Sequence, residues 1–195
     1  IKPGARMSVL KQDQNQYDAY TILDTVIMGN QHLYDVMKEK DALYEKEDFT
    51  DEDGVKASEL EAEFAEMGGW EAESDVSRLI QGLGLSNDIL YSEMSSLTAK
   101  EKVKVLLAQA LFGKPDIILL DEPTNHLDAE MTAWLEDWLR RFKGGLVMVT
   151  HDRYFLERVV NHITELSRGK LYHYEANYSK YLELKACLLY TSPSP

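Results

Sequence analysis

A chain of 195 residues with 44% hydrophobic and 28% charged residues has the composition of a globular protein and not of a disordered one. No apolar run reaches the ~18–20 residues needed to cross a bilayer, and a single cysteine, Cys187, excludes a disulfide framework and an all-cysteine zinc site. The net charge of −13 argues against a protein that binds nucleic acid over its whole surface.

The charge is distributed unevenly along the chain. Residues 31–75 contain sixteen acidic and four basic residues, whereas the remaining residues contain eighteen acidic and seventeen basic ones. The body of the protein is therefore almost neutral, and the acidity lies in one segment that resembles an insertion.

The first half of the chain predicts one strand followed mainly by helices. Spacings near 3.6 residues between apolar positions indicate helices on both sides of a polar, acidic loop. The expected elements are a strand over 5–11, a short helix over 21–28, helices over 32–47 and 55–67 with a loop over 46–54, and a helix over 71–83.

The second half alternates helices with short apolar runs. Thr98 and Glu101 have the spacing of a capping box before a helix over 99–112, and Asp128 is placed to cap a helix that ends at Phe142. The continuous apolar runs 117–120 and 146–149 are typical of buried parallel strands. A helix over 153–160 and a hairpin of strands 163–166 and 170–174 follow. The predicted fold class is α/β with a largely parallel core sheet.

Polar residues follow both predicted parallel strands directly. Asp121 and Glu122 come after the first strand, and Thr150, His151 and Asp152 come after the second. Ligands of parallel α/β sheets bind beyond the carboxyl ends of the strands. An Asp there can hold Mg²⁺, directly or through water, and the next carboxylate can orient and deprotonate an attacking water. For a lone Asp-Glu pair a solvated turn would be the simpler explanation, but the whole run from Leu119 to Asp128 requires more.

That run, Leu119-Leu-Asp-Glu-Pro-Thr-Asn-His-Leu-Asp128, resembles the Walker B and D-loop segment of the ATP-binding-cassette (ABC) ATPases. Together with Thr150-His-Asp-Arg-Tyr-Phe-Leu156 it is similar to the soluble ABC-F subfamily. Val103–Phe112 matches the helix after the family's signature, and Tyr174-Glu-Ala-Asn-Tyr-Ser-Lys-Tyr181 resembles the closing motif. The resemblance covers nearly all of residues 1–186. It implies a partial, N-terminally truncated first nucleotide-binding domain with a parallel core sheet and a helical subdomain.

The resemblance also implies roles for individual residues. Asp121 would support Mg²⁺, Glu122 would be the catalytic base, and His151 would contact the γ-phosphate and the attacking water. Gln12, in the family's Q-loop position, would sense Mg²⁺ and γ-phosphate, and Asp128 would help to couple two facing domains. The alternative for His151 is a hydrogen-bonded helix cap, and for Gln12 a surface position.

Further implications concern ligands and partners. The parent protein would bind ATP and Mg²⁺ in the cytoplasm, hydrolyse ATP between this domain and a second nucleotide-binding domain of the same chain, and act on the ribosome in translation. Two alternatives remain open: the ATPase subunit of an ABC transporter, or a non-catalytic regulatory ABC domain.

The sequence departs from the family at two motifs. No Gly-Lys pair is followed by Ser or Thr, so the phosphate-binding Walker A loop is absent and the isolated polypeptide is expected to bind ATP poorly. The signature Leu-Ser-Gly-Gly-Glu reads Leu97-Thr-Ala-Lys-Glu101. Thr98, Ala99, Lys100 and Glu101 are therefore the predicted nucleotide contacts of an altered or slow composite site, because the β-carbon of Ala99 hinders a close approach to phosphate.

Two segments carry expectations of their own. Residues 31–75 lie where ABC-F proteins carry the arm that touches the ribosome. Because their negative charge would repel RNA phosphates, a basic ribosomal protein or solvent is the expected neighbour. The alternative is an ordinary helical subdomain with a solvated face. The segment 187–195 resembles a translated sequencing adapter and is expected to be a non-native tail, with the helical pattern stopping at residue 186.

Overall fold

The computed structural model describes residues 3–191 of the chain. At its centre lies a three-stranded parallel sheet in the order β1-β2-β3, formed by β1 (Met7–Val9), β2 (Ile117–Asp121) and β3 (Gly145–Val149). In the register, Ile117 of β2 is opposite Met7 on one side and Gly145 on the other. Helix α6 (Ala129–Arg141) connects β2 to β3, and this β-α-β unit confirms the expected parallel α/β fold.

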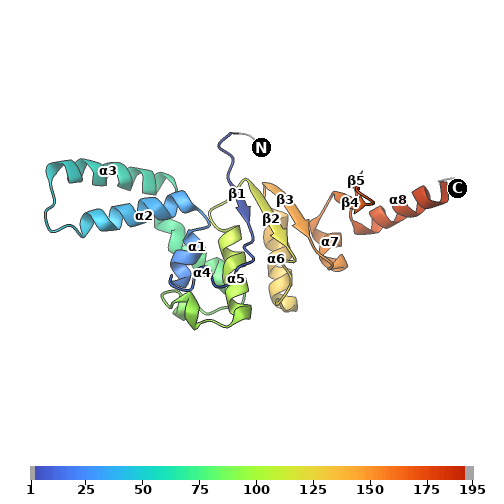
Figure 1. Cartoon of the computed structure of the whole chain (residues 1–195), viewed down its shortest axis with the longest axis horizontal. Helices are drawn as coiled ribbons and strands as arrows, with labels where there is room; N and C mark the ends of the chain where they lie inside the picture. Colours follow the sequence, from blue (N-terminus) through green and yellow to red (C-terminus); the bar gives the residue numbers. More distant parts are fainter. Residues whose placement is uncertain (1–2, 192–195) are drawn as a thin grey trace.

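A helical layer packs beside the sheet (Figure 1). It contains α1 (Ile22–Ile27), α4 (Ala72–Gly82) and α5 (Ala99–Leu111). A short 3-10 turn at Gly69–Glu71 precedes α4, and two more, at Asn87–Ile89 and Met94–Ser96, lie between α4 and α5. Helix α5 is its centre, because every residue from Val105 to Leu111 is buried. The Thr98–Glu101 capping box predicted from the sequence is present at its start. The predicted helix over 71–83 is present as α4, and its inward face buries Val76, Leu79 and Ile80.

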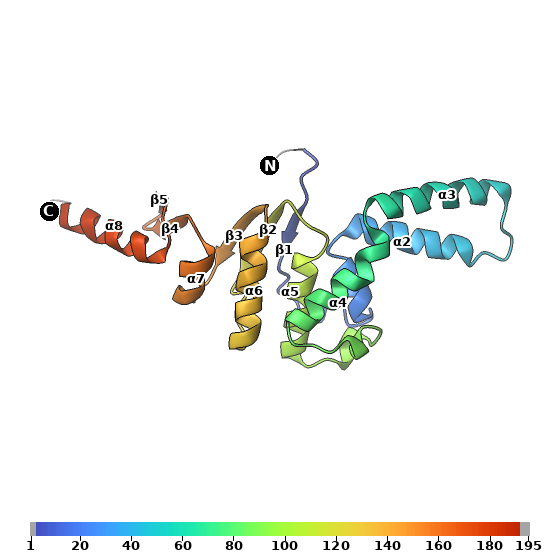
Figure 2. The same ribbon diagram turned by 180° about the vertical axis from the view of Figure 1, so that it is seen from behind.

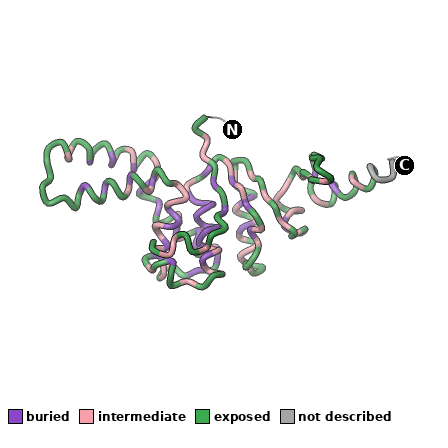
Figure 3. Tube along the Cα trace, viewed as in Figure 1, coloured by how far each residue is buried: buried purple, intermediate pink, exposed green. Residues whose placement is uncertain are grey.

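The acidic segment forms a helical hairpin that projects from the body, as both Figure 1 and Figure 2 show. Its helices are α2 (Gln31–Tyr44) and α3 (Asp51–Glu66). Figure 3 shows their buried positions on the sides that face each other. The predicted loop over 46–54 was wrong at its end: α3 begins at Asp51, so Gly54 lies within the helix. Thr50 and Asp53 form a capping box, and acidic side chains in a first turn stabilise a helix.

The C-terminal part lies on the far side of β3 (Figure 1). It consists of α7 (Arg153–Val159), the antiparallel pair β4 (Ile163–Ser167) and β5 (Lys170–Tyr174), and α8 (Tyr178–Thr191). The expectation that the helical pattern stops at residue 186 was wrong, because α8 continues through Cys187. The apolar residues Leu188–Tyr190 have ordinary helical propensity and no proline interrupts them. The adapter origin of 187–195 stays a prediction, and residues 192–195 lie outside the described part.

Strand β3 corrects a second expectation. Its continuous apolar run predicted burial on both faces, but Val147 and Val149 are each 60% exposed. Within residues 3–191, β3 is an edge strand of its sheet and only the face that carries Leu146 and Met148 packs against the core. None of the helices in the described residues combines the length and apolar composition that crossing a bilayer would require.

Candidate functional site

The carboxyl ends of the three parallel strands bring several of the predicted residues together. Asp121 ends β2 opposite Val149 of β3, and the backbone N–H of Glu122 donates to the carbonyl of Val149 at 2.8 Å. The residues after the two strands therefore start from adjacent positions at one edge of the sheet. This is the edge at which parallel α/β sheets bind ligands.

Glu122 is held in a constrained position at this edge. Its φ of 45° lies in the left-handed region that non-glycine residues rarely adopt. The Thr150 hydroxyl donates to Glu122 Oε2 at 3.2 Å and the backbone N–H of His151 approaches the same oxygen at 3.4 Å. Backbone strain of this kind persists where surrounding contacts over-determine it, often at functional sites.

The other carboxylate oxygen of Glu122 remains available for a ligand. Oε1 is buried and accepts no hydrogen bond from the described residues, although the His151 ring Nε2 lies 3.6 Å from it. The imidazole itself is almost fully exposed, at 98%. An orphaned buried acceptor costs free energy unless a water or a substrate group satisfies it, so this oxygen is suited to hold a water beside an exposed imidazole.

Gln12 reaches the same edge from the segment that follows β1. The chain leaves β1 alongside β2, with the N–H of Leu10 donating to the carbonyl of Leu119 at 3.0 Å. Two residues later, the Gln12 side-chain Nε2 donates to Asp121 Oδ2 at 3.3 Å. The structure thus places Gln12, Asp121, Glu122 and His151 along one edge, and their roles stay predictions.

The side-chain oxygens of Asp121 and Gln12 are chemically suited to bind Mg²⁺. Asp121 supplies an exposed carboxylate and Gln12 an amide oxygen, both hard donors of the type that Mg²⁺ prefers. The described residues contain no group of three or more His, Cys, Asp or Glu side chains that could hold a metal ion on their own. Mg²⁺ commonly uses one or two carboxylates together with phosphate oxygens and waters, so a nucleotide would have to complete its coordination.

The predicted signature residues lie elsewhere. Thr98 and Glu101 are hydrogen-bonded to each other at the start of α5. The Thr98 hydroxyl and backbone N–H donate to Glu101 Oε2 at 2.7 and 2.8 Å. These hydrogen bonds lower the pKa of Glu101. Ala99 and Lys100 are exposed in the first turn. In the described part of the chain, no hydrogen bond or ion pair joins 98–101 to Asp121, Glu122 or His151.

Asp128 is likewise a capping residue in this structure. Its Oδ1 accepts from the N–H of Met131 at 2.9 Å at the start of α6, as the sequence predicted. A coupling role between facing domains requires a partner domain and stays a prediction.

Two features were missed by the sequence reasoning. Thr150 positions Glu122 through its hydroxyl; its place directly before His151 was the available signal. Lys102, nearly buried in α5, donates to Asp18 at 2.6 Å and to Asn15 at 2.9 Å. Nothing in the sequence pairs residues so far apart, yet this contact ties α5 to the loop that follows Gln12.

Comparisons with known proteins show the family to which this chain belongs. The family model described as "ABC transporter" matches residues 2–125. The chain is 54% identical over 183 residues to "Uncharacterized ABC transporter ATP-binding protein YkpA" of Bacillus subtilis (strain 168), covering 94% of this chain and 34% of that protein. It is 36% identical over 191 residues to "Energy-dependent translational throttle protein EttA" of Mycobacterium tuberculosis (strain ATCC 25618 / H37Rv), covering 95% and 33%.

The chain therefore spans about a third of the length of these curated relatives. Among solved structures, "Structure of ATP binding subunit of ABC transporter" has the same fold, with a TM-score of 0.63 at 17% identity over 92% of this chain and 68% of that one. The relatives are consistent with the ABC-F resemblance noted in the sequence. With more than half of its length matched by the family model and with its fold shared, the chain belongs to the ABC transporter family of ATP-binding proteins.

Proposed function

We propose that this chain is part of the first nucleotide-binding domain of a cytoplasmic ABC-F ATPase that hydrolyses ATP and acts on the ribosome in translation. The observation that carries the ATPase proposal is the cluster of Gln12, Asp121, Glu122 and His151 at one sheet edge. The translational part is supported by the printed name of the EttA relative and by the motifs of the sequence.

Glu122 is the proposed general base. Its Oε2 is fixed by Thr150 and the His151 backbone, while Oε1 has no hydrogen-bond partner among the described residues. A water that donates to Oε1 would be oriented and would lose its proton there as it attacks. His151, with its exposed ring 3.6 Å from the same oxygen, is placed to donate to a phosphate oxygen and to the attacking water.

Asp121 and Gln12 are the proposed ligands of Mg²⁺. When bound, the ion would neutralise charge on the β- and γ-phosphate oxygens. The Gln12–Asp121 hydrogen bond of 3.3 Å orients the carboxylate, and the loop that contains Gln12 is tied to α5 through Lys102. Phosphoryl transfer depends mainly on such positioning and on charge stabilisation.

The signature residues 98–101 and Asp128 are proposed to face a nucleotide held by a second nucleotide-binding domain. Ala99 and Lys100 are exposed at the N-terminus of α5, where helix dipole and backbone N–H groups favour an anion. The methyl group of Ala99 keeps phosphate farther from the backbone than glycine would. We therefore expect this composite site to be slower than one with two glycines.

The test uses the longer protein that contains this chain. Glu122→Gln removes the base and keeps the shape, so single-turnover ATP hydrolysis at this site should fall by roughly 10²- to 10⁴-fold, with ATP still bound. Glu175→Gln, which changes an exposed carboxylate directly after β5, is the matched control and should leave the rate unchanged. An unchanged rate in Glu122→Gln would reject the catalytic assignment.

The transporter alternative is favoured by one observation, the fold shared with a transporter's ATP-binding subunit. Fractionation of cells that express the tagged longer protein separates the two proposals: recovery with ribosomes supports the translational role, and recovery with membranes supports transport. The altered residues Ala99 and Lys100 favour a non-catalytic domain, which would show no single-turnover hydrolysis above that of Glu122→Gln.

A further inference from the structure

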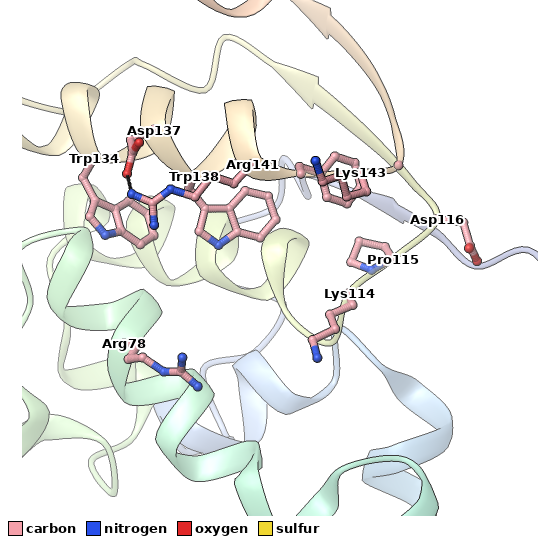
Figure 4. A pocket seen from close by; sticks show the side chains of 11 residues that line it. Arg78, Lys114, Pro115, Asp116, Trp134, Asp137, Trp138, Arg141 and Lys143 are labelled. Carbon is pink, nitrogen blue, oxygen red and sulfur yellow. Dashed lines mark hydrogen bonds and ion pairs between the residues drawn. The ribbon is translucent and has the colours of Figure 1, made fainter.

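A hollow lies at the opposite end of the sheet from Glu122. It encloses about 760 Å³ and is bounded by α4, the turn that precedes β2, and α6 with the turn that precedes β3 (Figure 4). Because Pro115 and Gly144 stand just before the amino ends of β2 and β3, this hollow is separate from the proposed ATP site.

One wall of the hollow is aromatic. Trp134, Trp138 and Phe142 follow one another at four-residue spacing along α6 and its end, so they share one face of the helix. Trp138 and Phe142 are stacked, with ring centroids 5.6 Å apart and an interplanar angle of 16°. All three rings are only half-buried. Part of each ring therefore remains exposed along the hollow, although Trp138 and Phe142 also cover part of each other.

The rim of the hollow is basic, although the chain as a whole has a net charge of −13. Four cations line it from separate elements: Arg78, Lys114, Arg141 and Lys143. Arg78 and Arg141 pair with Asp75 and Asp137 on their own helices. Lys114 and Lys143 make no ion pair with the described residues, and both are exposed.

The acidic residues of the hollow do not cancel this charge. Asp137 is engaged by Arg141, and Asp116 accepts the backbone N–H of Arg6 at 2.8 Å. The Arg6 side chain also stabilises the turn before β2 by donating a hydrogen bond to the carbonyl of Gly113. The two lysines are therefore the cations most available to a ligand.

We propose that this hollow binds a single-stranded nucleic-acid segment, with a base stacked on the aromatic wall and the flanking phosphates beside the cations. Aromatic faces bind any base through stacking, and cations along the same groove follow the backbone. Lys114 comes from the turn before β2 and Lys143 from the turn before β3, so they can contact phosphates on different sides of one base. A duplex hides its base faces and could not use the Trp138 ring. The proposal does not depend on the ATPase assignment.

The test measures fluorescence anisotropy of a labelled octa-adenylate RNA titrated with the full chain. We expect saturable binding that weakens as salt rises from about 50 to 200 mM. Trp138→Ala should weaken it by roughly 5- to 150-fold, the range of one lost stacking contact, and Trp138→Phe should retain most of the affinity. The double variant Lys114→Ala/Lys143→Ala should flatten the salt dependence by about 0.7 in log–log slope for each lost phosphate contact.

The control is Lys170→Ala, which removes an exposed charge at the β4–β5 hairpin and should change nothing. Because both lysines of the double variant are exposed, its fold is expected to persist, and far-UV circular dichroism checks this. Absence of binding, or equal binding by all variants, overturns the proposal. So does equal affinity for AMP alone, which identifies a mononucleotide site, or full displacement by octaglutamate, which identifies a site for any polyanion.

Discussion

The contact between Lys102 and Asp18 links the helical layer to the loop that follows Gln12, and its removal gives a measurable prediction. The Lys102 side chain is 9% exposed and donates to Asp18 at 2.6 Å, whereas the Asp18 side chain is 39% exposed. Lys102→Met keeps most of the buried hydrocarbon and removes the charge. It leaves Asp18 and Asn15 without their donor.

The magnitude follows from this uneven burial. Hydrogen bonds to charged groups contribute ~1.5–3 kcal/mol, and the lower part of that range applies because water can resolvate the half-exposed Asp18. We expect a loss of about 1.5–2 kcal/mol in the free energy of unfolding. For a chain of this size, that corresponds to a decrease of roughly 3–8 °C in Tm.

Urea unfolding followed by circular dichroism measures the change, and a double-mutant cycle with Asp18→Asn isolates the pair. The expected coupling energy is about 1 kcal/mol, with little dependence on salt because the ammonium group is nearly buried. Lys170→Met, at an exposed hairpin position, is the control and should change stability by less than about 0.5 kcal/mol. Additive single effects in the cycle would refute the reasoning.

Three further predictions concern stability, pH and catalysis. Gln109→Leu removes a buried side chain whose amide donates to a carbonyl of α1 at 2.7 Å, and chemical denaturation should show a loss of about 1–3 kcal/mol; no loss would show that the contact is dispensable. Hydrogen bonds from Lys46 and from the Thr50 helix cap lower the pKa of Asp53 from 3.8 to about 2. The stability that ionised Asp53 gives to α3 is therefore complete above about pH 4 and is lost as the pH falls toward 2. Far-UV circular dichroism should show this loss in the native chain and not in Asp53→Asn. Thr150→Val removes the hydroxyl that donates to Glu122, so single-turnover ATP hydrolysis by the longer protein should fall roughly 10-fold, and an unchanged rate would show that Thr150 does not position the base.

The sequence predicted most elements because their signals are local. Capping residues such as Thr98 and Asp128 bond to backbone within three positions, and apolar spacing reports which face of α4 is buried. The errors also have local reasons. The predicted loop before α3 is too long because three acidic residues and Gly54 suggest a turn. The Thr50–Asp53 capping box instead starts the helix at Asp51.

Burial and long-range contacts, in contrast, could not be predicted from local sequence signals. The run that forms β3 is as apolar as a fully buried strand, but Val147 and Val149 remain exposed because burial depends on what packs against each face. The spacing of Trp134, Trp138 and Phe142 in the sequence indicates only one apolar face of a helix. Only its position beside Arg78 and Lys114 shows that this face borders a basic hollow.

For the candidate site, the chain itself already determined that acids and an imidazole would follow parallel strands, since strand direction and residue order place them at one edge. Tertiary structure decided the rest: the left-handed backbone of Glu122, its contact with Thr150, and the link from Lys102 to Asp18. These depend on distances between segments far apart in the chain, which no local propensity encodes, because only packing of the whole sheet and its helices brings the atoms together.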